Sequence, residues 1–280
     1  MSARFGERVR HALRERGPLC VGIDPHIALL DAWGVSLDAD GAREFGLRTV
    51  EAAAGRIGFV KPQVSFFERF GSAGIAALED VLVAARASDL IVIADAKRGD
   101  IGSTMDAYAA AWLTPGSPLE ADAMTVSPYL GVGALDGAFA LAERAHKGLF
   151  VLAATSNPEA AQLQRALGDG GESVSRRVVA EVSERNRGAD AGEWGSFGVV
   201  IGATVSWHAA GLAAFTPAAP ILAPGFGAQG AEPADLRRRF GSMSDCVIAS
   251  ESRSILSAGP DGLAAAIDAR NAQYLEVPRG

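Results

Sequence analysis

Short runs of apolar residues recur along the chain, and the residues between them leave room for a helix and two loops. Eight of these runs predict strands: Leu19–Ile23, Ile57–Val60, Leu90–Ala94, Ala123–Val126, Leu149–Ala153, Phe197–Ile201, Ile221–Ala223 and Cys246–Ala249. The runs are apolar at nearly every position and show little polar alternation. This pattern is typical of a parallel sheet that is buried on both faces.

Stretches with helical spacing lie between the runs, the clearest being Ala73–Arg86, Gly133–Ala145, Val174–Arg185 and Glu232–Phe240. Alternating strands and helices predict an α/β fold, and eight such units in 280 residues fit a closed (β/α)8 or TIM barrel better than an open sheet. No change of composition marks a linker, so we expect one domain over residues 1–280. The long gap between the fifth and sixth runs predicts surface excursions around a helix.

The residues before the first run predict a separate helix that caps one end of the barrel. Phe5, Val9 and Leu13 are spaced four apart, as on one face of an amphipathic helix. Glu7 and Glu15 among the arginines argue against a transit peptide, and the apolar centre of a signal peptide is missing. No apolar run is long enough to span a membrane. We therefore expect a cytoplasmic protein.

The overall charge restricts the class of partner. The chain carries 33 acidic and 26 basic residues, and its net charge of −7 argues against a nucleic acid or a membrane surface as partner. Cys20 and Cys246 are too few for a disulfide framework or a thiolate metal site. Both lie in apolar runs, so we expect two buried, reduced thiols.

Lysine is rare in this chain, which holds only three lysines among its 26 basic residues. Where arginine fills nearly every basic position, a lysine can mark a place that needs a compact charge able to give up its proton. Lys61 and Lys97 both follow predicted strands and fit this interpretation. Lys147 lies beside a glycine in a predicted loop, where we expect no special role.

In barrels of this kind the active site lies where the strands end and the following loops begin. The polar residues at these positions are Asp24, Lys61, Asp95, Lys97, Ser127, Thr155, Ser156, Thr204, Glu251 and Arg253. A structural network can also gather charged groups. So many ionisable side chains at one rim nevertheless favour a reaction site.

The last two strand ends predict a phosphate site. The seventh run continues into a glycine-rich segment, APGFGAQG, and the eighth into ESRS. Glycines let backbone N–H groups turn towards an anion, and Arg253 offers the two parallel donors that a phosphate prefers. The loops after the seventh and eighth strands are the common phosphate site of these barrels.

The end of the third run predicts the chemical centre. Asp95 and Lys97 are two residues apart, so on a strand they point to the same face. Lys61 ends the neighbouring strand. Asp100 follows Gly99 and can either return towards Lys97 or point to a neighbouring chain. The four charged groups alternate in sign, which keeps each of them ionised despite partial burial.

The segment DAKRGDIGST, residues 95–104, resembles the signature of the orotidine 5′-phosphate decarboxylase family. The resemblance extends through VGIDPH, FVKPQ, TSNP, PGFGAQG and SRSI, which span nearly the whole chain. One segment departs from the pattern. The fourth strand continues as TVSPYLG, so Ser127 receives no role.

The resemblance implies the decarboxylation of orotidine 5′-monophosphate to uridine 5′-monophosphate without a metal or another cofactor. Lys97 would protonate C6 of the pyrimidine as CO₂ leaves, and Asp95 would crowd the substrate carboxylate. Lys61 would hold Asp95 and a ribose hydroxyl. Asp24 would also bind the ribose.

The same resemblance implies a homodimer, in which Asp100, Ile101 and Thr104 reach into the partner's site. Either Ser156 or its neighbour Thr155 would bind the pyrimidine edge, with Ser156 preferred. The phosphate would be held by Gln229, Arg253 and the backbone around Gly227.

Three other functions fit parts of the pattern. A Schiff-base aldolase would use Lys97 as a nucleophile, but flanking carboxylates favour its charged form. A metal-dependent sugar-phosphate decarboxylase or epimerase needs metal ligands, and no histidine ends a predicted strand; His26 is the nearest. A phosphometabolite-binding barrel without activity would not need the Asp–Lys–Asp pattern, which is intact here.

Overall fold

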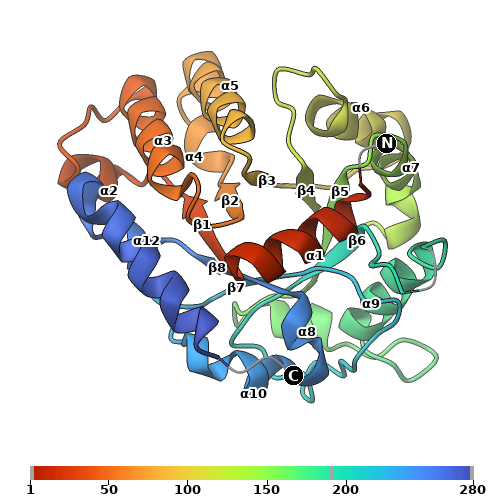
Figure 1. Ribbon diagram of the computed structural model, residues 1–280. Helices are drawn as coiled ribbons and strands as arrows, with labels where there is room; N and C mark the ends of the chain where they lie inside the picture. The colour runs from red at the N-terminus through yellow and green to blue at the C-terminus, as the bar shows by residue number, and fades with distance from the viewer. Residues whose placement is uncertain (1–2, 190–191, 278–280) are drawn as a thin grey trace.

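The computed structural model of the protein describes residues 3–189 and 192–277. Its eight strands form a closed parallel barrel in which each strand pairs with the next and the last pairs with the first (Figure 1). The strands are β1 (Leu19–Ile23), β2 (Phe59–Pro62), β3 (Ile91–Arg98), β4 (Ala123–Val126), β5 (Gly148–Ala154), β6 (Phe197–Ile201), β7 (Ile221–Pro224) and β8 (Val247–Glu251). The predicted (β/α)8 barrel is confirmed.

Helices surround the barrel and connect most successive strands, whereas residues 202–220 join β6 to β7 without a helix (Figure 1). The longer ones are α1 (Phe5–Arg16), α3 (Ala39–Ala53), α5 (Gly71–Ala87), α6 (Gly102–Leu113), α7 (Asp136–Arg144), α9 (Val174–Arg185) and α12 (Gly259–Leu275). The shorter ones are α2 (Ile27–Ala32), α4 (Ser65–Glu68), α8 (Ala160–Gln164), α10 (Leu236–Phe240) and α11 (Arg253–Leu256), together with the 3₁₀ turns η1 (Val132–Leu135), η2 (Pro233–Asp235) and η3 (Gly241–Cys246).

The largest difference from the predicted elements is at β3. The apolar run ends at Ala94, but the strand continues to Arg98. Its pairing with β4 shifts register between Ala94 and Arg98, and Lys97 has a φ angle of 47°. The buried part of β3 itself extends past this run to Asp95 and Ala96. An apolar run can therefore stop short of the end of its strand, because backbone pairing does not require an apolar side chain.

Two predicted helices divide into a 3₁₀ turn followed by an α-helix. The predicted helix Gly133–Ala145 consists of η1 and α7, and the predicted helix Glu232–Phe240 consists of η2 and α10. In the long gap after β5, α8 buries none of its side chains and α9 buries one face. The predicted surface excursion 186–196 lies partly outside the described residues.

Helix α1 closes the end of the barrel at which the strands begin (Figure 1). Phe5, Val9 and Leu13 are buried against side chains that fill the barrel interior, as their spacing predicts. The ring of Phe5 meets Phe150 edge-on at 6.0 Å between centroids. A Cβ atom on Gly148 would lie 2.3 Å from the Phe5 ring, so this approach requires a glycine.

Both cysteines are buried and unpaired, as expected. Burial raises the pKa of Cys20 and of Cys246 to about 12, which keeps both thiols protonated and unreactive near neutral pH. No helix in the described ranges is long and apolar enough to cross a membrane. One domain over residues 1–280 stays a prediction, because both termini lie outside the described residues.

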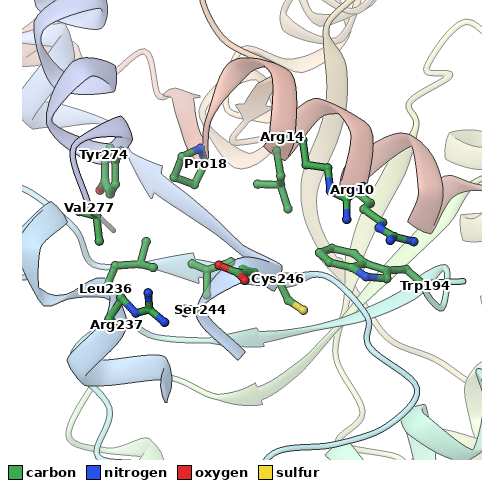
Figure 2. Close-up of a pocket in the computed structure, with 13 residues that line it drawn as sticks. Arg10, Arg14, Pro18, Trp194, Leu236, Arg237, Ser244, Cys246, Tyr274 and Val277 are labelled. Carbon is green, nitrogen blue, oxygen red and sulfur yellow. The ribbon is translucent and has the colours of Figure 1, made fainter. Parts of the chain in front are cut away.

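A cavity of about 420 Å³ lies beside α1 at this closed end. Figure 2 shows Arg10 and Arg14 reaching from α1 towards Trp194, Cys246 and the start of β8. None of the predicted site residues lines this cavity. Most of the predicted site residues lie instead around a cavity at the other end of the barrel.

Candidate active site

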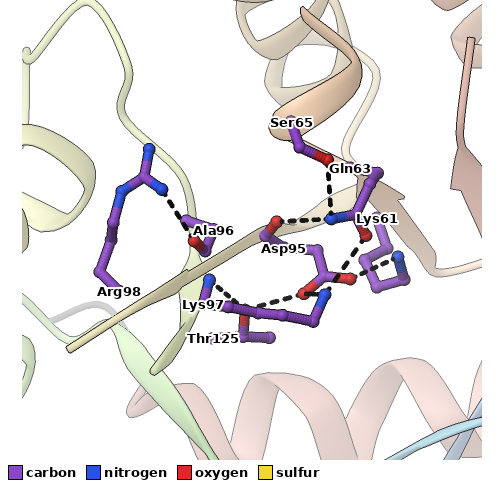
Figure 3. Close-up of polar contacts among 8 residues, drawn as sticks. All are labelled: Lys61, Gln63, Ser65, Asp95, Ala96, Lys97, Arg98 and Thr125. Carbon is purple, nitrogen blue, oxygen red and sulfur yellow. Dashed lines mark hydrogen bonds and ion pairs between the residues drawn. The ribbon is translucent and has the colours of Figure 1, made fainter. Parts of the chain in front are cut away.

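The predicted chemical centre forms at the carboxyl ends of β2 and β3. Figure 3 shows Asp95 between two lysines: Lys61 Nζ lies 3.0 Å from Asp95 Oδ2, and Lys97 Nζ lies 2.6 Å from Asp95 Oδ1. The side chains of Lys61 and Asp95 are 7% and 9% exposed, whereas that of Lys97 is 46% exposed. One ammonium is therefore fixed inside the barrel, and the other reaches its open mouth.

The two buried members of this group hold each other in their charged forms. Burial alone would raise the pKa of Asp95, but Lys61 and Lys97 outweigh it and lower that pKa well below its ordinary value. Burial alone would lower the pKa of Lys61, but Asp95 and Asp24 outweigh it and raise that pKa. The site therefore holds a fixed negative charge beside a proton-carrying ammonium.

Two residues that the sequence analysis did not single out join this group. The Gln63 side chain accepts a hydrogen bond from Lys97 Nζ at 3.4 Å and donates one to the backbone carbonyl of Asp95 at 3.3 Å. The Thr125 hydroxyl lies 2.8 Å from Asp95 Oδ1. Strand alternation could have identified both, because Gln63 is two residues beyond Lys61 and Thr125 is two beyond the buried Ala123.

A cavity of about 650 Å³ opens beside Lys97, a volume within the ordinary range of small-molecule sites. Its walls include eight predicted residues: Asp24, Lys61, Asp95, Lys97, Thr155, Ser156, Gln229 and Arg253. His26, Ser65, Phe66 and Asn157 line it as well. The structure thus brings the predicted chemical centre and the predicted phosphate site into one cavity.

The predicted phosphate site lies at the ends of β7 and β8. Gly225, Gln229 and Arg253 line the cavity there. Gly227 has a φ of 67°, and a Cβ atom on it would lie 2.3 Å from Glu251 Oε2 and Ser254 Oγ. Its own N–H donates to the carbonyl of Ala231 at 2.8 Å, so Gly227 shapes the turn that presents Gln229.

The cavity wall at the ends of β1 and β8 contains unsatisfied polar atoms. Among the described side chains, Asp24 Oδ1 and Ser252 Oγ are buried without a hydrogen-bond partner, and both residues line the cavity. Buried polar atoms are normally paired, so these two are available to a bound molecule that carries hydroxyl groups. Ser156 Oγ donates to Gln229 Oε1 at 3.3 Å, and Thr155 is engaged with Asn157 and Gln164.

Three predicted residues lie away from the cavity of their own chain. Asp100 precedes α6, and its Oδ1 accepts a hydrogen bond from the N–H of Ile101 at 2.8 Å. Ile101 and Thr104 are exposed at the start of α6. None of the three lines the cavity.

Three of the strand-end residues do not belong to the rim of the site. Ser127 and Thr204 lie outside the cavity lining. Glu251 is buried but points outwards, where it accepts hydrogen bonds from Arg270 at 2.6 Å and from the Tyr274 hydroxyl at 2.7 Å, both on α12. Its neighbours Ser250 and Ser252 face the cavity, so alternation along β8 directs Glu251 to the opposite side.

The expectation for Lys147 was wrong. It is buried at the closed end of the barrel, with Nζ 2.8 Å from Glu120 Oε1 and 3.8 Å from Asp122 Oδ1. Asp122 also accepts a hydrogen bond from Arg8 of α1 at 2.6 Å. Lys147 is thus part of a charged cluster that joins the barrel to its capping helix.

Within residues 3–189 and 192–277 there is no group of three or more His, Cys, Asp or Glu side chains arranged to hold a metal ion. His26, the histidine closest to a strand end, contacts the ring of Phe66 at 4.1 Å between centroids.

A barrel whose charged cavity opens at the carboxyl ends of its strands defines a class, that of the TIM-barrel enzymes. The sequence profile of the orotidine 5′-phosphate decarboxylase / HUMPS family matches residues 17–268. The chain belongs to this family, and it is a decarboxylase, that is, a carboxy-lyase.

Two curated relatives and one solved structure show how close the similarity is. The chain is 52% identical to the orotidine 5′-phosphate decarboxylase of Salinispora arenicola, over 92% of this chain and 91% of that protein. It is 50% identical to that of Streptomyces coelicolor, with 92% and 91% covered. A candidate orotidine 5′-phosphate decarboxylase from Streptomyces avermitilis has a crystal structure that superposes with a TM-score of 0.92, at 46% identity, covering 98% of this chain and 96% of that one.

Proposed function

We propose that this chain converts orotidine 5′-monophosphate to uridine 5′-monophosphate and CO₂, the last step of de novo uridine monophosphate synthesis, with Lys97 as the proton donor. The observation that carries this proposal is the Lys61–Asp95–Lys97 group at the wall of a cavity whose opposite side holds Gln229 and Arg253. Family membership and curated relatives at about half identity support the substrate.

The reaction breaks the bond between C6 of the pyrimidine and its carboxylate. The electron pair stays on C6, and CO₂ leaves. No carbonyl next to C6 can accept this charge, so the nearby ammonium of Lys97 stabilises the carbanion and then gives it a proton. The neutral amine regains a proton from water. Arginine would supply the charge without the proton, because it does not deprotonate near neutral pH.

Asp95 and Lys61 prepare this step. The fixed carboxylate of Asp95 lies 2.6 Å from Lys97 Nζ and orients it. The same carboxylate repels the carboxylate of the bound substrate. It repels the transition state less, because there the substrate carboxylate is losing its negative charge as CO₂ leaves. Lys61 holds the other oxygen of Asp95 at 3.0 Å and faces the ribose together with Asp24, whose Oδ1 has no partner among the described residues.

The far end of the cavity binds the phosphate through Arg253, Gln229 and the backbone of the glycine-rich loop. Contacts this far from C6 supply binding energy that can be used to close loops and exclude water. Ser156 lies next to Gln229, between the phosphate end and the chemical end, and we assign it to the pyrimidine edge. Ser156 binds the substrate and the transition state about equally. It therefore stabilises the transition state less than Arg253 does through its contacts with the phosphate.

We further propose that the working unit is a homodimer in the cytoplasm, with part of each site coming from the partner. Asp100, Ile101 and Thr104 face away from their own cavity. The chain also exposes several large apolar side chains, among them Ile101, 63% exposed, and Tyr129, 76% exposed, with Tyr108 and Leu130. A second copy packed against the start of α6 would cover Ile101.

Subunit mixing tests the shared site. Lys97→Ala and Asp100→Ala chains should each be inactive alone. A mixed dimer would contain one site with both residues and one with neither, so random exchange should restore about a quarter of wild-type activity. Absence of recovery, once mass spectrometry has shown that the chains exchange, would place Asp100 in the site of its own subunit.

The Schiff-base alternative is not favoured by the geometry, because a nucleophilic amine must be neutral and Lys97 Nζ forms a close ion pair with Asp95. Incubation of the purified chain, treated with chelator, with orotidine 5′-monophosphate tests the reaction itself. We expect loss of the substrate absorbance and stoichiometric release of CO₂. Turnover that requires added metal, or inactivation by borohydride only when substrate is present, would contradict the proposal.

A further inference from the structure

Ser127, the residue that follows β4, contributes nothing to the cavity. Two residues earlier, Thr125 does line the cavity, and it is 1% exposed. It projects to the same side of β4 as the interior residue Ala123. Thr125 therefore occupies the inward position of this strand that is nearest to the chemical centre.

The Thr125 hydroxyl bridges the two central residues of the site (Figure 3). It accepts a hydrogen bond from the backbone N–H of Lys97 at 2.9 Å. Because an N–H group can only donate, the proton of the hydroxyl is left for Asp95 Oδ1, 2.8 Å away. The directions of both hydrogen bonds are thus fixed.

The backbone around Lys97 explains why a side chain is needed here. Ala94 pairs with Met124 and Arg98 with Val126, so three residues of β3 lie opposite the single residue Thr125 of β4. Such a bulge leaves backbone groups outside the regular ladder. The Thr125 hydroxyl supplies the acceptor that the strand does not supply to the Lys97 N–H.

The bulge also gives Lys97 its unusual conformation. Its φ of 47° lies in the left-handed region, which non-glycine residues adopt only when their surroundings hold them there. From this backbone the Lys97 side chain returns to Asp95, with Nζ at 2.6 Å from Oδ1, the same oxygen that accepts from Thr125. The backbone and the head group of Lys97 are therefore both tied to one hydroxyl–carboxylate pair.

Resting on the proposed function, we propose that Thr125 is a positioning residue, whose hydroxyl fixes the Lys97 ammonium and the Asp95 carboxylate in the arrangement that delivers the proton to C6. Thr125 does not take part in the chemistry itself. Its effect is expected in kcat, since it acts on the geometry of the reacting group, and only weakly in KM.

Replacing Thr125 with Val keeps the shape of the side chain and removes the hydroxyl. We expect kcat for orotidine 5′-monophosphate to fall by about 10² while KM changes by less than about threefold. Thr125→Ser keeps the hydroxyl and should recover most of the loss. If the Thr125→Val chain does not fold, Thr125→Ala compared with Thr125→Ser makes the same test.

Thr49→Val is the matched control. Thr49 is also fully buried, but its hydroxyl donates to the carbonyl of Phe45 within α3, away from the cavity. The Thr49→Val substitution also removes a buried hydrogen bond, but it should leave kcat within about twofold of wild type. A crystal structure of the Thr125→Val chain supplies a readout independent of turnover, and it should show the Lys97 backbone or its contact with Asp95 displaced.

Several outcomes would overturn the inference. One is a Thr125→Val chain whose kcat equals that of wild type, or in which only KM changes. Another is a Thr125→Ser chain as slow as Thr125→Val. A third is a Thr125→Val structure in which the geometry of Lys97 is unchanged. Failure of the proposed function is recognised separately, because the wild-type chain itself would then not act on orotidine 5′-monophosphate. The variant structure still tests the positioning role in that case.

Discussion

The barrel carries a buried lysine–carboxylate cluster at each end, and the two clusters differ in what they leave unsatisfied. At the closed end, Lys147 is 8% exposed and contacts Glu120, while both oxygens of Asp122 are occupied, one by Arg8 and the other by the N–H of Val92 at 2.9 Å. At the open end, Lys97 is 46% exposed, reaches a cavity and stands on a left-handed backbone.

A buried lysine beside carboxylates therefore does not by itself mark a reaction site. Both clusters contain lysines, which are rare in this arginine-rich chain, and in both the lysines lie beside carboxylates. The open cluster is distinguished by donors and acceptors that face a cavity, including Asp24 Oδ1 and the Lys97 ammonium. The closed cluster joins the barrel to α1 and uses its charges for stability.

The largest expected effect comes from making the same substitution in both clusters. Lys97→Arg should lose at least about 10³ in kcat, since guanidinium keeps the charge but delivers no proton, and it should still bind uridine 5′-monophosphate. Lys147→Arg should keep its activity. Steady-state kinetics and calorimetric binding measure both. If kcat of the Lys97→Arg chain were within tenfold of wild type, the two clusters would not differ in their need for a lysine.

A smaller loss is expected at the phosphate end of the cavity. Arg253→Ala should reduce kcat/KM by about 10², more than Ser156→Ala does, because Arg253 grips the phosphate through charge-assisted hydrogen bonds. Added phosphite dianion should partly restore turnover of a substrate that lacks the phosphate. If the wild-type chain processes the phosphate-free nucleoside as well as the nucleotide, the grip has no part in catalysis.

At the closed end the effect should appear in stability and not in turnover. Lys147→Met removes the ion-pair partner of Glu120, whose Oε2 keeps only the N–H of Gly116, and should lower the free energy of unfolding by about 3 kcal/mol, as expected when one partner of a buried ion pair is removed. Urea unfolding measures this loss, and kcat of the folded chain should stay within about twofold of wild type. A large loss of kcat with unchanged stability would mean that this cluster has a catalytic role.

The smallest effect is the response to pH. The pKa of Asp95 lies below its ordinary value of 3.8, so this carboxylate stabilises the fold above about pH 4, and its contribution is lost as the pH falls through the lowered value. The raised pKa of Lys61 keeps that ammonium charged to strongly basic pH. Neither group should therefore produce a limb in kcat between about pH 5 and 9. A limb that Asp95→Glu shifts would contradict this.

Much of the fold was predictable because each strand of the barrel is buried on both faces and shows as an apolar run. The Asp95–Lys97 pair was predictable because both residues follow such a run at a spacing of two. The bulge opposite Thr125 was not, since it depends on the register between β3 and β4, which no local pattern reveals. The ion pairs of Lys147 could not be recognised either. Its partners Glu120 and Asp122 precede β4 in the sequence, and helix α7 separates them from Lys147.

Chemical rescue tests whether the open cluster works through an ammonium at the position of Lys97. Lys97→Cys introduces a thiol at the open cavity, whereas the native Cys20 and Cys246 are buried with raised pKa values, which disfavours their alkylation. Treatment with 2-bromoethylamine then rebuilds a lysine-like side chain that ends in an ammonium. Lys97→Ala, treated in the same way, is the control.

The untreated Lys97→Cys chain should be nearly inactive, and alkylation should raise its kcat by at least about 10². The treated control should stay inactive. Mass spectrometry should show a single aminoethyl group at the new thiol. If such a chain still binds uridine 5′-monophosphate but remains inactive, an ammonium at this position is not what drives the reaction.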